Sequence, residues 1–173
     1  DGDRANPTAE TSARSTSPVN NAGKWFKAAL GSAAANANVV TGILPNGASQ
    51  LTSVLSQPIS QWVKHMLLVS DNTQAEFLAR LVSLKQGFDG SFNSISAAFK
   101  RALSSTSLDS SSLVIKDGSG LSNFNAVPPV YLAKLSKLIM SGTGNYQVVL
   151  QGLPIAGESG SLSARFKGDN VDA

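Results

Sequence analysis

The chain has 173 residues, of which 42% are hydrophobic and 14% charged, and this apolar fraction excludes a fully disordered protein. The net charge of +3, with basic residues scattered along the chain, argues against a nucleic-acid partner. The absence of cysteine excludes a disulfide scaffold, a cysteine-ligated zinc site and a thiol nucleophile, and the single histidine, His65, excludes a histidine-rich metal site.

The sequence contains no transmembrane or targeting segment. Its longest apolar stretches, 39–44 and 66–69, fall short of the roughly 20 residues that a membrane-spanning helix needs. Residues 1–4 lack the basic-then-apolar order of a signal peptide and do not begin with Met, so we expect a chain that was processed or cut from a longer protein. Residues 1–17 are polar and aperiodic, and we expect a linker or a disordered lead-in there.

The first half of the chain predicts two helices with two short strands between them. A helix is expected from Pro18, because the apolar residues that follow it lie on one helical face. Residues 39–44 and 51–55 are expected to be strands on either side of a turn at 45–47. A second helix is expected after Pro58, where apolar residues again recur at the helical period.

Three more helices are expected in the second half. One begins at the capping-box pattern Thr73–Glu76 and stops at Gly87. The next covers residues 92–103, and the last opens at Pro128–Pro129.

The remaining segments are expected to be short strands and turns. A strand is predicted at 113–115, running into a turn at 117–120, and the glycine-rich tail is expected to be irregular. Because helices dominate and the strands are few and short, the predicted fold class is α+β, mostly α.

The residues that stand out chemically are Ser70, Asp71 and Asn72, at the junction between two apolar helices. A hydroxyl and a carboxamide two positions apart on such a junction can point into one cleft. There the hydroxyl can relay a proton and the carboxamide can hold a carbonyl, as acyl transfer on an amide requires. The same residue types are also the preferred N-caps of helices, so the tripeptide alone favours a structural role over a catalytic one.

Three blocks give this tripeptide a context. Residues 66–80 resemble the S-D-N motif of the penicillin-recognising serine acyltransferases, whose other motifs are S-x-x-K and K-T-G. Residues 115–128 resemble the D-G-S-G-L-S block of the penicillin-binding protein 4 type D-alanyl-D-alanine carboxypeptidases, peptidase family S13. Residues 153–166 resemble the block that precedes K-T-G in that family. The resemblance implies that residues 18–173 form part of a penicillin-binding transpeptidase-like domain, its helical part with a few short strands.

The other two motifs of that family are missing from the sequence. No serine has a lysine three residues later, since Ser60 to Lys64 and Ser96 to Lys100 are each one residue too long. No K-T-G occurs, because Lys167–Gly168 lacks the hydroxyl residue between them. We therefore expect an internal to C-terminal fragment that is inactive alone and completed by the rest of the parent polypeptide. A standalone relative that lost both motifs is the alternative.

The resemblance implies roles for individual residues. Ser70 would relay a proton between the missing lysine and the leaving amine, and Asn72 would hydrogen-bond the backbone of the substrate. Leu121 would line the pocket for the peptide side chain, where Asn123 replaces an arginine that the family often has. Asp71 is expected either to contribute to substrate binding or to cap the helix.

The resemblance also implies what the parent protein does. It would cleave D-alanyl-D-alanine from peptidoglycan peptides, as a carboxypeptidase or endopeptidase, through a serine acyl-enzyme and without a cofactor or a metal. It would bind β-lactam antibiotics and work outside the cytoplasmic membrane of a bacterium, while its membrane association stays open. The alternative function is a non-catalytic binding or structural module derived from the helical part of the fold.

Other candidates are set aside. A class A β-lactamase needs a glutamate followed four residues later by asparagine, a pattern that none of Glu10, Glu76 and Glu158 meets. His65 lacks any partner signature of a catalytic base and is expected at the surface or boundary of its helix. Trp62 is expected on the core face of the same helix.

Overall fold

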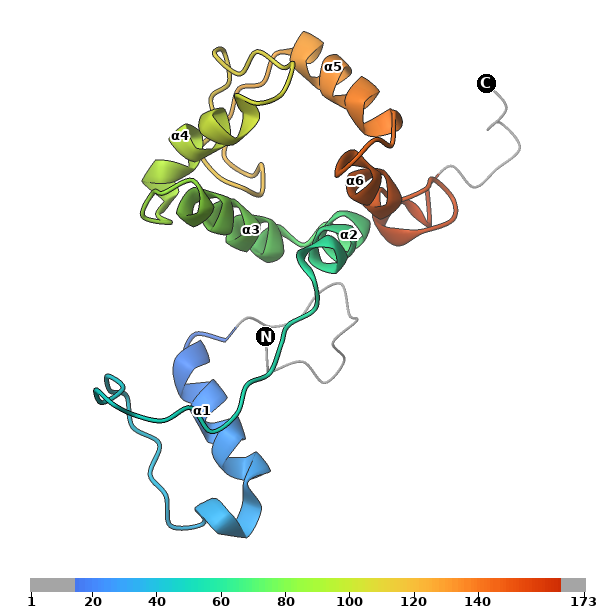
Figure 1. The fold of residues 1–173 in the computed structure, drawn as a ribbon. Coiled ribbons are helices and arrows are strands. Elements are labelled where there is room, and N and C mark those ends of the chain that lie inside the picture. Colours follow the sequence, from blue (N-terminus) through green and yellow to red (C-terminus); the bar gives the residue numbers. More distant parts are fainter. Residues whose placement is uncertain (1–14, 166–173) are drawn as a thin grey trace. The chain divides into compact units, whose positions relative to one another are not determined.

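The computed structural model describes residues 15–165, which form helices joined by loops (Figure 1). The chain divides into two compact units, Asp1–Leu55 and Ser56–Ala173. Its helices are α1 (Pro18–Ala29), α2 (Ile59–Val69), α3 (Asn72–Lys85), α4 (Phe92–Leu103), α5 (Pro129–Met140) and α6 (Tyr146–Gly152), with 3-10 turns η1 (Gly31–Ala34) and η2 (Gly160–Leu162). Most of the predicted lead-in, residues 1–14, lies outside the described range, and a single domain over 18–173 stays a prediction.

In the first unit, α1 begins at Pro18, as the sequence predicts. Its apolar face is not covered within the described residues, because Trp25 is 39% exposed and Phe26 is 66% exposed. The turn at 45–47 is present, since the amide of Ala48 donates to the carbonyl oxygen of Pro45 at 3.2 Å.

The two strands predicted beside that turn are not formed. Residues 39–44 and 51–55 have no ladder of hydrogen bonds, and Ile43 and Leu51 are 97% and 96% exposed. An isolated pair of strands is marginal in water, because strands gain stability from a sheet or a helix that covers their apolar face. The prediction of two strands is therefore wrong, although the sequence does have two apolar stretches on either side of a turn.

In the second unit, α3 and α4 pack against each other through three small side chains and one isoleucine. Ala79 and Ser83 of α3 and Ile95 and Ala98 of α4 are buried. The hydroxyl of Ser83 is satisfied by that of Ser94, 2.6 Å away, and by the amide of Gly90, 3.1 Å away. A buried hydroxyl with two partners is no penalty to stability, so this contact fixes how α4 lies on α3.

The rest of the second unit continues around α2, which contacts both α3 and α6 (Figure 1). Tyr131 of α5 forms a small core with Leu108 and Leu113 of the preceding loop, and α5 contacts α6 in turn. Within the described residues the β structure is a single bridge between Val114 and Ala126. The fold class α+β, mostly α, is confirmed, with the strand expected at 113–115 reduced to this bridge.

Two further expectations are corrected. The tail contains α6, which the sequence analysis missed because a helix of two turns with the β-branched pair Val148–Val149 has a weak helical pattern. The capping box at Thr73–Glu76 is also wrong, because α3 starts earlier, with Asp71 as its N-cap. Glu76 is thereby left free to bind elsewhere.

Candidate active site

The S-D-N tripeptide forms the turn between α2 and α3. Ser70 ends α2 in the left-handed conformation, with φ 57° and ψ 47°, and is the single non-glycine residue with positive φ among residues 15–165. The amide of Asp71 closes the turn by donating to the carbonyl oxygen of Met66 at 3.0 Å, a pattern usually built on glycine. A serine in this conformation costs about 1–2 kcal/mol, and such strained residues cluster at functional sites.

Asp71 faces into the turn. Its carboxylate accepts a hydrogen bond from the amide of Gln74 at 3.0 Å, and the residue is only 8% exposed. This is the N-cap geometry. A carboxylate at this position also interacts favourably with the positive end of the helix dipole. The structure therefore supports the capping role of Asp71, while its role in substrate binding stays a prediction.

Ser70 and Asn72 lie on either side of this cap and are both exposed. Within residues 15–165 neither side chain hydrogen-bonds another protein group. The hydroxyl and the carboxamide are therefore both open to solvent, and their roles in proton relay and substrate binding stay predictions.

The loop 117–122 carries Leu121 and is held by the carboxylate of Asp117. This carboxylate accepts from the amides of Gly120 at 2.9 Å and Ser122 at 2.6 Å, and from Nδ2 of Asn125 at 2.8 Å. Burial alone would raise the pKa of Asp117, but these hydrogen bonds outweigh it and hold the pKa below its usual value. Leu121 is 69% exposed, so the loop is rigid at its base and offers this side chain to solvent.

The same loop is docked on the first turns of α3 by Glu76. Its Oε2 accepts from the amide of Gly118 at 3.0 Å, and its Oε1 accepts from the amide and hydroxyl of Ser119 at 3.0 and 2.6 Å. Gly118 packs so closely that an added Cβ would lie 2.5 Å from the Cβ of Ala79 and 2.7 Å from the carbonyl oxygen of Ala75. The D-G-S-G block thus lies on the helix that Asn72 begins.

The third block contacts the other helix of the junction. Gly160, with φ +56°, lies against the carbonyl oxygen of Leu68 in the last turn of α2, where any side chain would clash with the backbone. The amide of Gly157 donates to the carbonyl oxygen of Leu162 at 3.0 Å, which closes the loop that presents this glycine. The second and third blocks named from the sequence therefore contact α3 and α2, the two helices of the junction, while Phe166 to Gly168 lie outside the described residues.

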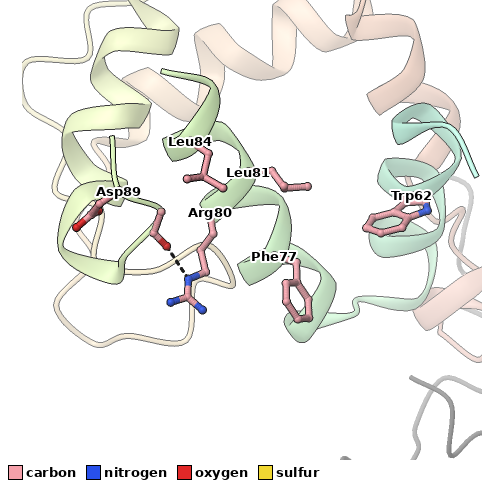
Figure 2. Close-up of a pocket in the computed structure, with 7 residues that line it drawn as sticks. Trp62, Phe77, Arg80, Leu81, Leu84 and Asp89 are labelled. Atoms are coloured by element: carbon pink, nitrogen blue, oxygen red, sulfur yellow. Dashed lines mark hydrogen bonds between the residues drawn. The ribbon is translucent and has the colours of Figure 1, made fainter. Parts of the chain in front are cut away.

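An apolar pocket of about 450 Å³ lies further along α2 and α3 (Figure 2). Its lining residues are Trp62, Phe77, Arg80, Leu81, Leu84, Asp89 and Gly90. Trp62, expected in a core, faces this open space instead. Arg80 Nε donates to the carbonyl oxygen of Gly90 at 2.8 Å, as Figure 2 shows. None of Ser70, Asn72 and Leu121 lines this pocket, so it is not the candidate active site.

Two other sequence candidates lie outside the S-D-N turn itself. His65 is half-buried within α2, and Glu158 is exposed in the loop before Gly160. The residue that sequence reasoning missed is Glu76, which the pattern assigned to a capping box. Its partners lie 42 and 43 positions away, so no local pattern signals them.

The chain is similar in sequence to known carboxypeptidases. The sequence model of the D-Ala-D-Ala carboxypeptidase 3 (S13) family matches residues 3–173. The chain is 34% identical to carboxypeptidase DacB of Mycolicibacterium smegmatis, with 96% of this chain and 36% of that protein aligned. It is 29% identical to D-alanyl-D-alanine carboxypeptidase DacB of Haemophilus influenzae, over 75% of this chain and 27% of that protein.

Solved structures agree with the sequence comparison. The chain resembles crystal structures of penicillin binding protein 4 from Haemophilus influenzae, with a TM-score of 0.59, 30% identity, and coverage of 64% of this chain and 24% of that one. A second structure of that protein, complexed with a novel beta-lactam, gives a TM-score of 0.61, 30% identity, and coverage of 71% and 29%. The chain thus spans about a third of the length of its Mycolicibacterium smegmatis relative. It belongs to the D-Ala-D-Ala carboxypeptidase 3 (S13) family.

Proposed function

We propose that the protein containing this chain removes the terminal D-alanine from peptidoglycan peptides through a serine acyl-enzyme. Family membership supports this activity, since the relatives carry the names carboxypeptidase and D-alanyl-D-alanine carboxypeptidase. The chain itself contains the S-D-N motif and the two blocks around it, whereas S-x-x-K and K-T-G are not in its sequence. The nucleophile and its lysine would therefore come from the rest of the parent polypeptide, and the chain alone would be inactive.

The observation that carries the proposal is the strained, exposed Ser70 beside a free Asn72. Glycine adopts the left-handed conformation without a steric cost, so a serine at this position points to a use for its hydroxyl. In acylation the nucleophilic serine forms an ester with the peptide carbonyl as the amide bond to D-alanine breaks. Ser70 would pass the proton from the active-site lysine to the leaving amine, and water would later hydrolyse the ester.

The neighbouring residues would bind and support the substrate. Asn72 would hydrogen-bond the peptide backbone through both ends of its carboxamide. Leu121, exposed on its braced loop, would contact the peptide side chain, and Asp71 would hold the start of α3 in place. A β-lactam mimics the same peptide end, and the complex of the Haemophilus influenzae protein with a novel beta-lactam supports such binding here.

The substrate fixes where the protein would work. Peptidoglycan is assembled outside the cytoplasmic membrane, so the proposed location is extracytoplasmic, on the cell-wall side of a bacterium. None of the helices within residues 15–165 is long and apolar enough to cross a membrane. Cleavage of cross-linked peptides, an endopeptidase activity, would use the same acyl-enzyme with a different leaving amine.

The test is acylation of the intact protein by fluorescent penicillin. We expect Ser70→Ala to slow acylation by about a hundredfold, the lower range for loss of a proton-transfer group, with an unchanged melting temperature. Ser136→Ala, on the exposed surface of α5, removes the same atom away from the site and should leave the rate unchanged. An acylation rate for Ser70→Ala within about twofold of wild type would disprove the role of Ser70.

The alternative, a non-catalytic binding or structural module, has one observation in its favour. Two of the three motifs are missing from the 173 residues. The same experiment separates the two functions, because a non-catalytic protein takes up no penicillin label and hydrolyses no D-alanyl-D-alanine peptide.

A further inference from the structure

The carboxylate of Glu76 accepts three hydrogen bonds beside the candidate active site. Both of its carboxylate oxygens are used, Oε2 by the amide of Gly118 and Oε1 by the amide and hydroxyl of Ser119, at 2.6 to 3.0 Å. Hydrogen bonds to an ionised carboxylate are roughly twice as strong as neutral ones. These three bonds join two segments that are more than forty residues apart in the sequence.

The position of Glu76 on its helix relates the loop to the S-D-N motif. Glu76 follows Asn72 by four residues, and residues at this spacing lie on the same face of a helix. The loop that Glu76 holds is therefore attached to the face of α3 on which Asn72 lies. Gly118 packs directly on Ala75 and Ala79, which brings the loop backbone against the helix itself.

The loop transmits this attachment to Leu121. The amides on either side of Leu121, those of Gly120 and Ser122, are both held by Asp117. Asp117 in turn precedes Gly118 directly, so the loop is a braced turn with one anchor on α3. A change in the contact between Glu76 and the loop would therefore shift Leu121 relative to Asn72, while both side chains stay chemically intact.

We propose that Glu76 is the positioning residue that sets the distance between the peptide-side-chain contact at Leu121 and the backbone contact at Asn72. This role rests on the proposed function, because it concerns how the two substrate contacts are matched. Glu76 touches no substrate itself. Its loss should therefore harm substrates that use both contacts more than substrates that use only Asn72.

The experiment uses the intact protein and two substrates. One is a peptide with a full side chain before D-alanyl-D-alanine, and the other is acetylated D-alanyl-D-alanine, which has no such side chain. In Glu76→Gln we expect kcat/KM for the long peptide to fall about tenfold more than for the short one, mostly through KM. Glu158→Gln removes the same charge from an exposed loop and should leave the ratio of the two kcat/KM values at the wild-type value.

The outcomes distinguish this role from the activity it depends on. If kcat/KM falls equally for both substrates in Glu76→Gln, or does not fall, the positioning role is overturned. Activity of the wild-type protein would still support the proposed function in that case. A wild-type protein that cleaves neither substrate would overturn the proposed function and this role together. If Glu76→Gln does not fold, Ser119→Ala removes only the 2.6 Å bond and should shift the same ratio in the same direction, and an unchanged ratio counts against the proposal.

Discussion

The hydroxyl of Ser119 donates a 2.6 Å hydrogen bond to the carboxylate of Glu76, across 43 positions of sequence. Ser119 belongs to the D-G-S-G block and Glu76 to the helix that begins with Asn72. This bond and its two neighbours bring two of the family's blocks together without help from a sheet. These bonds attach the loop 117–122 to the helix that the S-D-N motif opens.

Ser70 gives a prediction about strain. Ser70→Gly and Ser70→Ala both remove the hydroxyl, but only glycine adopts the left-handed conformation without a steric penalty. We expect the free energy of unfolding of Ser70→Gly to exceed that of Ser70→Ala by about 1 kcal/mol, while both lose acylation equally. Urea unfolding and penicillin labelling of the intact protein measure the two effects. Equal stabilities would show that the turn relaxes when the serine is replaced.

Asp71 gives a prediction that separates capping from substrate binding. Asp71→Ala should lower the free energy of unfolding by about 1 kcal/mol, because the amide of Gln74 loses its acceptor. Asp71→Asn keeps an acceptor oxygen and should stay within a few tenths of a kcal/mol of wild type. Both variants are compared by chemical unfolding and by KM for the peptide substrate. A KM that rises sharply in Asp71→Asn with stability unchanged would instead favour a role in binding.

Gly160 gives a prediction about close packing. Gly160→Ala places a methyl group against the carbonyl oxygen of Leu68 in addition to the cost of its positive φ. Gly144 has a nearly equal φ of +55° and nothing within 4 Å, so Gly144→Ala isolates the cost of φ alone. We expect Gly144→Ala to lose about 1 kcal/mol and Gly160→Ala to lose a further 1–3 kcal/mol from overpacking. Thermal unfolding checks this, and equal losses would mean that the loop moves away from α2 freely.

Asp117 gives a prediction about pH. Its folded-state pKa is lowered, so its stabilising contribution is complete above the unfolded-state pKa of about 3.9 and is lost as the pH falls through the lower folded-state value. We expect wild type to be more stable than Asp117→Asn near neutral pH, and this advantage to shrink as the pH falls below about 4. Urea unfolding across that pH range measures it. A difference that does not change with pH would show that Asp117 is not ionised in its role.

The sequence by itself determined the helices from α1 to α5 and the identity of the three blocks. Helical spacing, Pro18 and Pro129 at helix starts, and Gly87 at a helix end are local signals, and the structure follows them. The resemblance to the S13 family also came from contiguous stretches of residues. These features depend on neighbours within one or two helical turns, which is why the linear sequence contains them.

Tertiary structure decided the rest, because the deciding partners are far away along the chain. Residues 39–44 and 51–55 have strand-like patterns but no sheet beside them among the described residues, so they form no strands and are exposed. Trp62 has the spacing of a core residue yet lines an open pocket. Glu76 fits a capping box locally but binds Gly118 and Ser119. The donors that bind Glu76 lie 42 and 43 positions away in the sequence, so only folding brings them within reach of its carboxylate.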